Sequence, residues 1–115
     1  MDDSLRTALA VVLAAIAGGS AAGDGFRLTI GAGKFDEHCL KVEAGRTIAY
    51  RFEADGAVDF NIHHHRGKEV LYPVRRAATK SADATFQAES SDDYCLMWEN
   101  KGTATVTVEG RVERR

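Results

Sequence analysis

Beyond residue 25, apolar and polar side chains alternate along short segments that Gly, Asp and Asn residues separate. A period of two residues is typical of a β-strand with one buried face. The first such segment, residues 26–30, places Phe26, Leu28 and Ile30 on one face. Further segments with this pattern are residues 38–43, 47–53, 57–65, 69–72, 84–88, 94–99 and 103–109. The pattern therefore predicts seven or eight strands and almost no helix.

Two stretches bear on how the strands connect. Asp55-Gly56 lies between segments 47–53 and 57–65. This dipeptide is a strong hairpin signal because Gly accepts a positive φ, so we expect these segments to form a hairpin. Residues 74–81 are basic, rich in small side chains and without a clear period. Short strands at regular spacing predict an all-β fold, an antiparallel β-sandwich with Greek-key or jelly-roll connections; a closed barrel is the alternative.

The first 22 residues have the pattern of an export signal. An unbroken apolar run, residues 9–17, follows an arginine, and Ser20 and Ala22 have the small side chains required at the −3 and −1 positions of a signal-peptidase site. The run is shorter than the roughly 20 residues of a membrane span. We expect a signal peptide over 1–22 and one domain over 23–115, in a periplasmic or secreted protein. An uncleaved anchor is the alternative.

Charge and motifs exclude several classes of function. The formal net charge of the 115 residues is −2, and no block of basic residues is present, so a nucleic-acid partner is not expected. The sequence contains no Gly-x-Ser-x-Gly, no His-Glu-x-x-His and no glycine-rich phosphate loop. We therefore expect a protein without catalytic residues, with a metal hydrolase as the remaining enzymatic alternative.

Cys39 and Cys95 are the two cysteines of the chain. Two cysteines in an exported protein most often form one disulfide. Each falls on the polar face of its segment, so a bridge would join neighbouring strands or lie at an edge. The alternative is a pair of thiolate ligands in a mixed Cys/His metal site.

Three of the four histidines lie in residues 58–65. One face of this segment carries Val58, Phe60, Ile62 and His64, and the other carries Asp59, Asn61, His63 and His65. We expect His64 to be a hydrogen-bonded histidine at the core. Side chains two apart on a strand leave the same face about 7 Å apart, so His63 and His65 can share one metal ion.

Imidazole pairs suit copper or zinc, but two ligands alone bind weakly. The predicted helpers are Met97, whose thioether would favour Cu(I), and His38. Asp59 and Glu99 are further candidates. The alternative is a solvated histidine pair with Met97 covering a disulfide.

The order of several segments resembles a known family. These are Cys39, Ile48-Ala-Tyr-Arg-Phe52, Phe86-Gln-Ala88 and Tyr94-Cys-Leu-Met-Trp-Glu-Asn100. Together they resemble the GOLD domain, a lumenal β-sandwich of cargo receptors in the early secretory pathway. The resemblance implies a Cys39–Cys95 disulfide and a non-enzymatic module that binds another protein or a membrane-associated partner.

A second resemblance is to cupredoxins, which are exported β-sandwiches that bind copper. Tyr94-Cys95 and Met97 are similar to their late ligand cluster, although no histidine follows Cys95. Two functions are therefore expected as alternatives. One is metal handling through His63 and His65, and the other is a GOLD-like interaction with an envelope or secreted protein, without metal.

Overall fold

A computed structural model describes residues 24–115, so the expected signal peptide lies outside the described residues. The strands are β1 (Asp24–Ile30), β2 (Phe35–Val42), β3 (Thr47–Arg66), β4 (Glu69–Gln87), β5 (Asp92–Glu99) and β6 (Val106–Arg114). All strand pairs are antiparallel. Within residues 24–115, no helix is long and apolar enough to cross a membrane. The expected all-β fold is confirmed.

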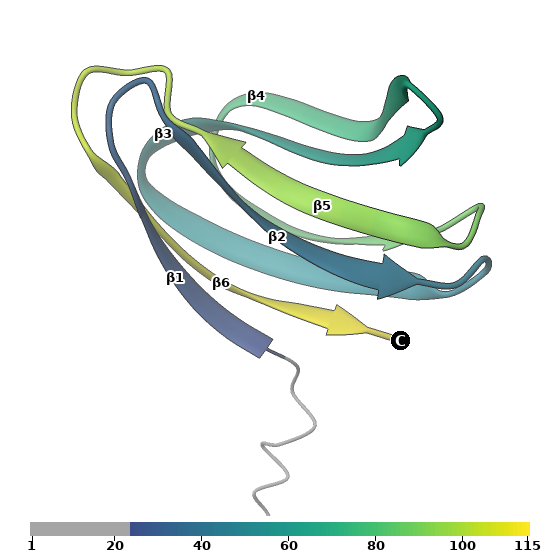
Figure 1. Cartoon of the computed structure of the whole chain (residues 1–115). Coiled ribbons are helices and arrows are strands. Elements are labelled where there is room, and N and C mark those ends of the chain that lie inside the picture. The colour runs from purple at the N-terminus through teal and green to yellow at the C-terminus, as the bar shows by residue number, and fades with distance from the viewer. Residues whose placement is uncertain (1–23) are drawn as a thin grey trace, which may run out of the picture.

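The strands form two layers, and the two long strands β3 and β4 take part in both. Residues 48–54 of β3 pair with β6, and residues 59–63 pair with β5. Along its other edge, β3 pairs with β4 over nearly its whole length, with register shifts beyond Glu53 where the strands bend. Sheet I is therefore β1-β6-β3-β4, and sheet II is β2-β5-β3-β4. The bend of β3 between the two layers is visible in Figure 1.

The prediction of a hairpin at Asp55-Gly56 was wrong, because these residues lie inside β3, at its bend. Asp55 Oδ1 accepts a hydrogen bond from the backbone N–H of Thr107 at 2.8 Å. A Cβ at position 56 would lie 2.9 Å from a methyl group of Val106. Gly56 is thus required by the close approach of β6 rather than by a turn. The hairpin turn is at Gly67, whose φ is +64°.

Six strands replace the expected seven or eight because β3 and β4 each run through two of the predicted segments. Residues 74–81 are part of β4. Their alternation is interrupted where Ala78 adopts a φ of 48° and donates its N–H to Asp59 Oδ1 at 2.9 Å. At the other end of the chain, β6 begins at Val106 rather than at residue 103.

The core lies between the two sheets and is built from the apolar faces that the sequence predicted. Its largest fully buried side chains are Trp98, Tyr94, Phe52, Phe60, Ile30, Ile48 and Ile62. The ring of Trp98 lies 5.4 Å from that of Phe60 and 5.5 Å from that of Phe52, measured between centroids. Burial of one such side chain contributes about 1.5–3 kcal/mol, so this cluster joins the two sheets strongly.

Asn100 connects the loops at the bent end of the sandwich and is fully buried. Its Nδ2 donates hydrogen bonds to the carbonyl oxygens of Ile30 and Ala104 at 3.0 and 2.8 Å. Its Oδ1 accepts a hydrogen bond from the N–H of Gly102 at 2.9 Å. Its backbone N–H and C=O pair with the loop of residues 31–34. One side chain therefore satisfies three backbone groups that would otherwise lack partners.

Replacement of Asn100 by Ala should lower the free energy of unfolding by about 3 kcal/mol, because buried carbonyl groups would lose their donors. Urea unfolding measures the change. Thr103→Ala, in the same loop but exposed, is the control and should change it by less than about 0.5 kcal/mol. Equal losses for the two variants would contradict the role of Asn100.

Candidate functional site: the outer face of sheet II

Alternation places every second side chain of β2, β5, β3 and β4 on the outer face of sheet II, where they form rows across the strands. In one row, Cys39 lies opposite Cys95, and Cys95 lies opposite His63. In the next row, Met97 lies between Glu37 and Asn61. The late strand β5 thus runs directly beside the histidine-bearing half of β3.

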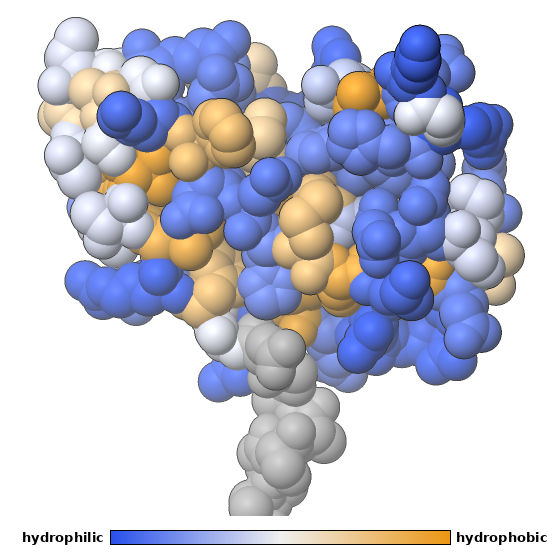
Figure 2. Space-filling model, viewed as in Figure 1, coloured by the Kyte–Doolittle hydropathy of each residue, from blue (hydrophilic) through white to orange (hydrophobic). Residues whose placement is uncertain are grey.

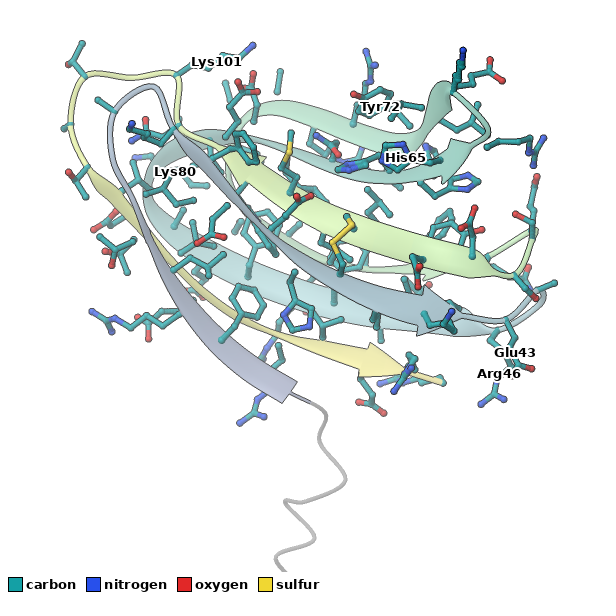
Figure 3. All side chains as sticks on the ribbon, viewed as in Figure 1. Glu43, Arg46, His65, Tyr72, Lys80 and Lys101 are labelled. Carbon is teal, nitrogen blue, oxygen red and sulfur yellow. A yellow bond between two sulfur atoms is a disulfide. The ribbon has the colours of Figure 1, made fainter. Side chains whose placement is uncertain are left out.

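The cysteines form the disulfide that the sequence predicted, with their Cα atoms 4.0 Å apart and 56 positions apart in the chain. Figure 3 shows it as a yellow bond between β2 and β5. Closure of a loop this long stabilises the fold by up to about 4 kcal/mol in the chain-entropy model. Cys39 is exposed because β2 is the edge strand of sheet II. The pair of thiolates considered as the alternative is therefore absent in this oxidised form.

His63 is only 8% exposed although it lies on an outer face. Its Nδ1 is 2.8 Å from Asn61 Oδ1, and its Nε2 is 3.5 Å from Glu37 Oε1. The ring centroids of Tyr72 and His65 lie 5.7 and 5.8 Å from that of His63. Burial lowers the pKa of His63, while the carboxylate of Glu37 acts in the opposite direction.

The structure brings together some of the sequence-predicted metal ligands and separates one of them. His63 and His65 share a face, as expected, and Met97 lies on that face one row away. His38 lies on the inner face of β2, opposite Leu96, with its ring 5.8 Å from that of Phe26. It cannot reach the other candidates without crossing the sheet. Metal binding by any of these residues stays a prediction.

Sequence reasoning missed Glu37 as a neighbour of the histidines. Ligand atoms of Glu37, His63 and Cys95 all lie within 4.8 Å of one another. The alternation of β2 was a usable signal, because it places Glu37 on the same face as Cys39. The pairing of β5 with β3 could not be read from the sequence, and together with the β2–β5 pairing it decides the proximity.

Large apolar side chains are also exposed on this face. Within residues 24–115, those with the greatest exposure are Phe35 (58%), Tyr72 (41%) and Val70 (37%). Phe35 lies opposite Glu99, and Val70 lies opposite His65, so both belong to the outer face of sheet II. Tyr72 belongs to the same face, next to His63. Figure 3 shows Tyr72 and His65 on the β3–β4 hairpin.

The guanidinium of Arg75 lies 4.1 Å from the centre of the Tyr72 ring, a cation–π contact. A shallow pocket of about 330 Å³ begins here and extends to Met97 and Glu99. Figure 2 shows in one view that the molecular surface is largely hydrophilic, with apolar side chains between the polar ones.

The outer face of sheet I differs from this surface. It carries charged and small polar side chains such as Arg51 and Asp83, which lie opposite each other on β3 and β4. Arg27 and Glu109 form an exposed ion pair at 3.2 Å on the same face. Exposed pairs of this kind contribute little to stability. This face therefore serves as a solvated reference surface in the same molecule.

His64 has the structural role expected from the sequence. It is 7% exposed, and its ring stacks against Tyr94 with 4.6 Å between centroids. Its Nδ1–H donates to Asp92 Oδ2 at 3.1 Å. Tyr94 in turn donates its hydroxyl to the carbonyl oxygen of Ser90 at 2.7 Å. These contacts fix the start of β5 against the end of β3.

No protein-family model matches the chain, and no curated protein sequence is significantly similar to it. Several solved structures share its fold. PliG of Aeromonas hydrophila, a periplasmic lysozyme inhibitor of g-type lysozyme, matches with a TM-score of 0.65 and 13% identity over 83% of this chain and 88% of PliG. The pre-peptidase C-terminal domain of the collagenase from Bacillus anthracis matches with a TM-score of 0.63 and 17% identity, over 79% of this chain and 89% of that domain.

PliG of Salmonella Typhimurium matches with a TM-score of 0.54 and 12% identity over 80% of this chain and 88% of that chain. At these identities the likeness shows the β-sandwich fold alone. Membership of the GOLD or cupredoxin families stays a prediction.

Acid should weaken the contact between β3 and β5 through Asp92. The hydrogen bond from His64, with a further one from the N–H of Asp93, holds the pKa of Asp92 below its usual range. A carboxylate whose pKa is lower in the folded state stabilises the fold above its unfolded pKa of about 3.9, and this contribution is lost as the pH falls through the folded value.

Asp92→Asn should therefore lower stability at pH 7, and its deficit relative to the unmodified protein should shrink below about pH 4. Urea unfolding between pH 7 and pH 3 measures this. Asp83→Asn removes a carboxylate from the outer face of sheet I and is the matched control. A deficit of Asp92→Asn that stays constant over this range would show that the charge of Asp92 is not the cause.

Proposed function

We propose that this protein is an exported, non-enzymatic module that binds a protein partner through the outer face of sheet II. The observation that carries the proposal is the position of Phe35, Val70 and Tyr72, the strongly exposed large apolar side chains of residues 24–115, on this one face. Single exposed apolar residues are ordinary, but several on one face are typical of an interaction surface.

The composition of the surface fits the same proposal. Aromatic residues, Met and Arg are enriched in the buried parts of protein interfaces, and Tyr and Arg are common among the residues that contribute most to binding. Tyr72 with Arg75 stacked on it, next to the partly exposed Met97, is such a combination. The β-ladder beneath fixes the backbone that carries these side chains, so no loop would have to be ordered on binding.

Export is supported by the disulfide and by the signal-like residues 1–22. Disulfides persist in oxidising compartments such as the periplasm and are rare in the cytosol. A β-sandwich fold shared with a periplasmic protein is in keeping with this location.

A g-type lysozyme is the first partner to test. Two of the solved structures with this fold are inhibitors of g-type lysozyme, which act by binding a protein. Binding of g-type lysozyme to the purified protein, and inhibition of its activity, test this partner directly. Absence of binding at a large excess of the protein would exclude it.

Photo-cross-linking tests the proposed face. A photo-reactive amino acid is placed at position 72 or at position 35 of the protein, in cells that express it. Adducts with one protein should form at both positions and be absent with the reactive group at position 85, on the outer face of sheet I. Adducts that are equal at all three positions, or absent at 72 and 35, would contradict the proposed face.

Tyr72→Ser combined with Phe35→Ser should then weaken binding to the partner found by cross-linking, or to g-type lysozyme, by 100-fold or more. Removal of a side chain that contributes strongly to an interface commonly costs about 2 kcal/mol. Isothermal titration calorimetry measures the affinity. Both side chains are exposed, so the thermal unfolding midpoint should change little. Thr85→Ser combined with Arg51→Ser is the control and should bind like the unmodified protein.

A further inference from the structure

We propose that Cys39, Cys95, His63 and Glu37 form a zinc site that becomes available when the Cys39–Cys95 disulfide is reduced. The two cysteines and His63 occupy one row on three neighbouring strands, in direct register. Glu37 comes from the adjacent row, and its carboxylate reaches His63. Two thiolates, an imidazole and a carboxylate are ligands that zinc prefers, in the number that a tetrahedral site requires. The proposal is independent of the protein partner proposed above.

The hydrogen bonds of His63 leave the correct nitrogen free for a metal. Nδ1–H donates to Asn61 Oδ1 at 2.8 Å, which fixes the tautomer in which Nε2 carries a lone pair. A metal-bound histidine almost always donates its other N–H in this way. Asn61 is thus placed as the residue that orients the imidazole toward the site.

The free nitrogen of His63 points to an acceptor rather than to a donor. Nε2 lies 3.5 Å from Glu37 Oε1, and in the neutral imidazole both atoms carry lone pairs. Two acceptors this close repel each other unless a proton or a metal cation lies between them. A divalent cation between the two atoms removes the repulsion.

The distances are close to those of a zinc site. Zinc–nitrogen and zinc–oxygen bonds of about 2.0–2.1 Å in tetrahedral geometry place the two ligand atoms about 3.3 Å apart, and a zinc-bound sulfur about 3.6 Å from the nitrogen. The observed distance from His63 Nε2 to Glu37 Oε1 is 3.5 Å, and the Sγ of Cys95 lies within 4.8 Å of a ring nitrogen of His63 and of a carboxylate oxygen of Glu37. After reduction, the Sγ of Cys95 has to approach by up to about 1 Å, and the Sγ of Cys39 has to separate from it to take the fourth position.

The change from disulfide to metal site requires a dithiol reductant. The dithiol supplies two electrons and two protons, the S–S bond breaks, Cys39 and Cys95 become thiols, and the reductant forms its own disulfide. Zinc then forms two Zn–S bonds and releases one proton from each thiol to solvent. Cys39 is exposed on the edge strand β2, so a reductant can reach the bond. Exchange with a disulfide oxidant reverses the change: the two thiolates form the Cys39–Cys95 bond again, the oxidant takes up two electrons and two protons to become a dithiol, and the zinc ion is released.

Zinc binding by the full chain, with and without reduction, tests the proposal. The protein is reduced without oxygen by a phosphine, which takes the place of the dithiol, and zinc is titrated in competition with a chromophoric chelator. One zinc per chain should bind the reduced protein, at least 100-fold more tightly than the oxidised protein. Cobalt in place of zinc should give the thiolate-to-metal charge-transfer absorption only after reduction. Equal zinc affinity in both forms would overturn the proposal.

Variants identify the ligands. His63→Gln and Glu37→Gln should each weaken zinc binding by the reduced protein at least tenfold. The matched controls on the same face, His65→Gln and Glu99→Gln, should change it less than threefold. A loss for His65→Gln as large as that for His63→Gln would overturn the ligand set proposed here.

Reduction removes a stabilising cross-link, so the reduced protein could unfold before it binds metal. In that case zinc should restore the β-sheet circular dichroism of the reduced protein, because a ligand that binds the folded state stabilises it by mass action. The same zinc concentration should fail to restore the β-sheet circular dichroism of the reduced His63→Gln variant. Equal recovery of the two proteins, or no recovery of either, would overturn the site. None of these outcomes depends on a protein partner.

Discussion

The bend shared by β3 and β4 is the constraint on which the rest of the structure depends. Because the same two strands run through both sheets and pair on either side of the bend, the layers cannot slide past each other without breaking backbone hydrogen bonds between β3 and β4. Gly56 allows β6 to approach the bend, and Asn100 satisfies the backbone groups of the loops that surround it. The aromatic cluster around Trp98 then fills the space that the bend encloses.

The strands also separate the side chains that pack in the core from the reactive side chains on the outer faces. Strand alternation directs one set of side chains into the core and leaves the other set on the outer faces. On sheet II, the outer set brings together a disulfide, two histidines, Glu37 and exposed aromatic residues, whereas on sheet I it is charged and small. The two faces of one small protein therefore differ in the partners that they suit, and sheet I offers matched control positions for sheet II.

His63 occupies an unusual place on the outer face. It is nearly as buried as a core residue because Tyr72, the disulfide and Asn61 surround its ring. An imidazole in such surroundings is held in one orientation and is disfavoured as a cation. His64, the next residue, is buried by the core itself and is held by Asp92. Adjacent histidines thus differ in role because they leave opposite faces of one strand.

The sequence by itself determined the all-β class, the inward face of the regularly alternating strands and the separation of His64 from His63 and His65, because a two-residue period is a local property of the chain. It also indicated the disulfide, since two cysteines that follow a signal-like N-terminal sequence most often form one bridge. Only the tertiary structure decided that Asp55-Gly56 is a bend within β3, that residues 74–81 continue β4 and that Glu37 reaches His63. These features depend on which strands pair and in which register, and pairing between distant segments leaves no periodic signal in the sequence.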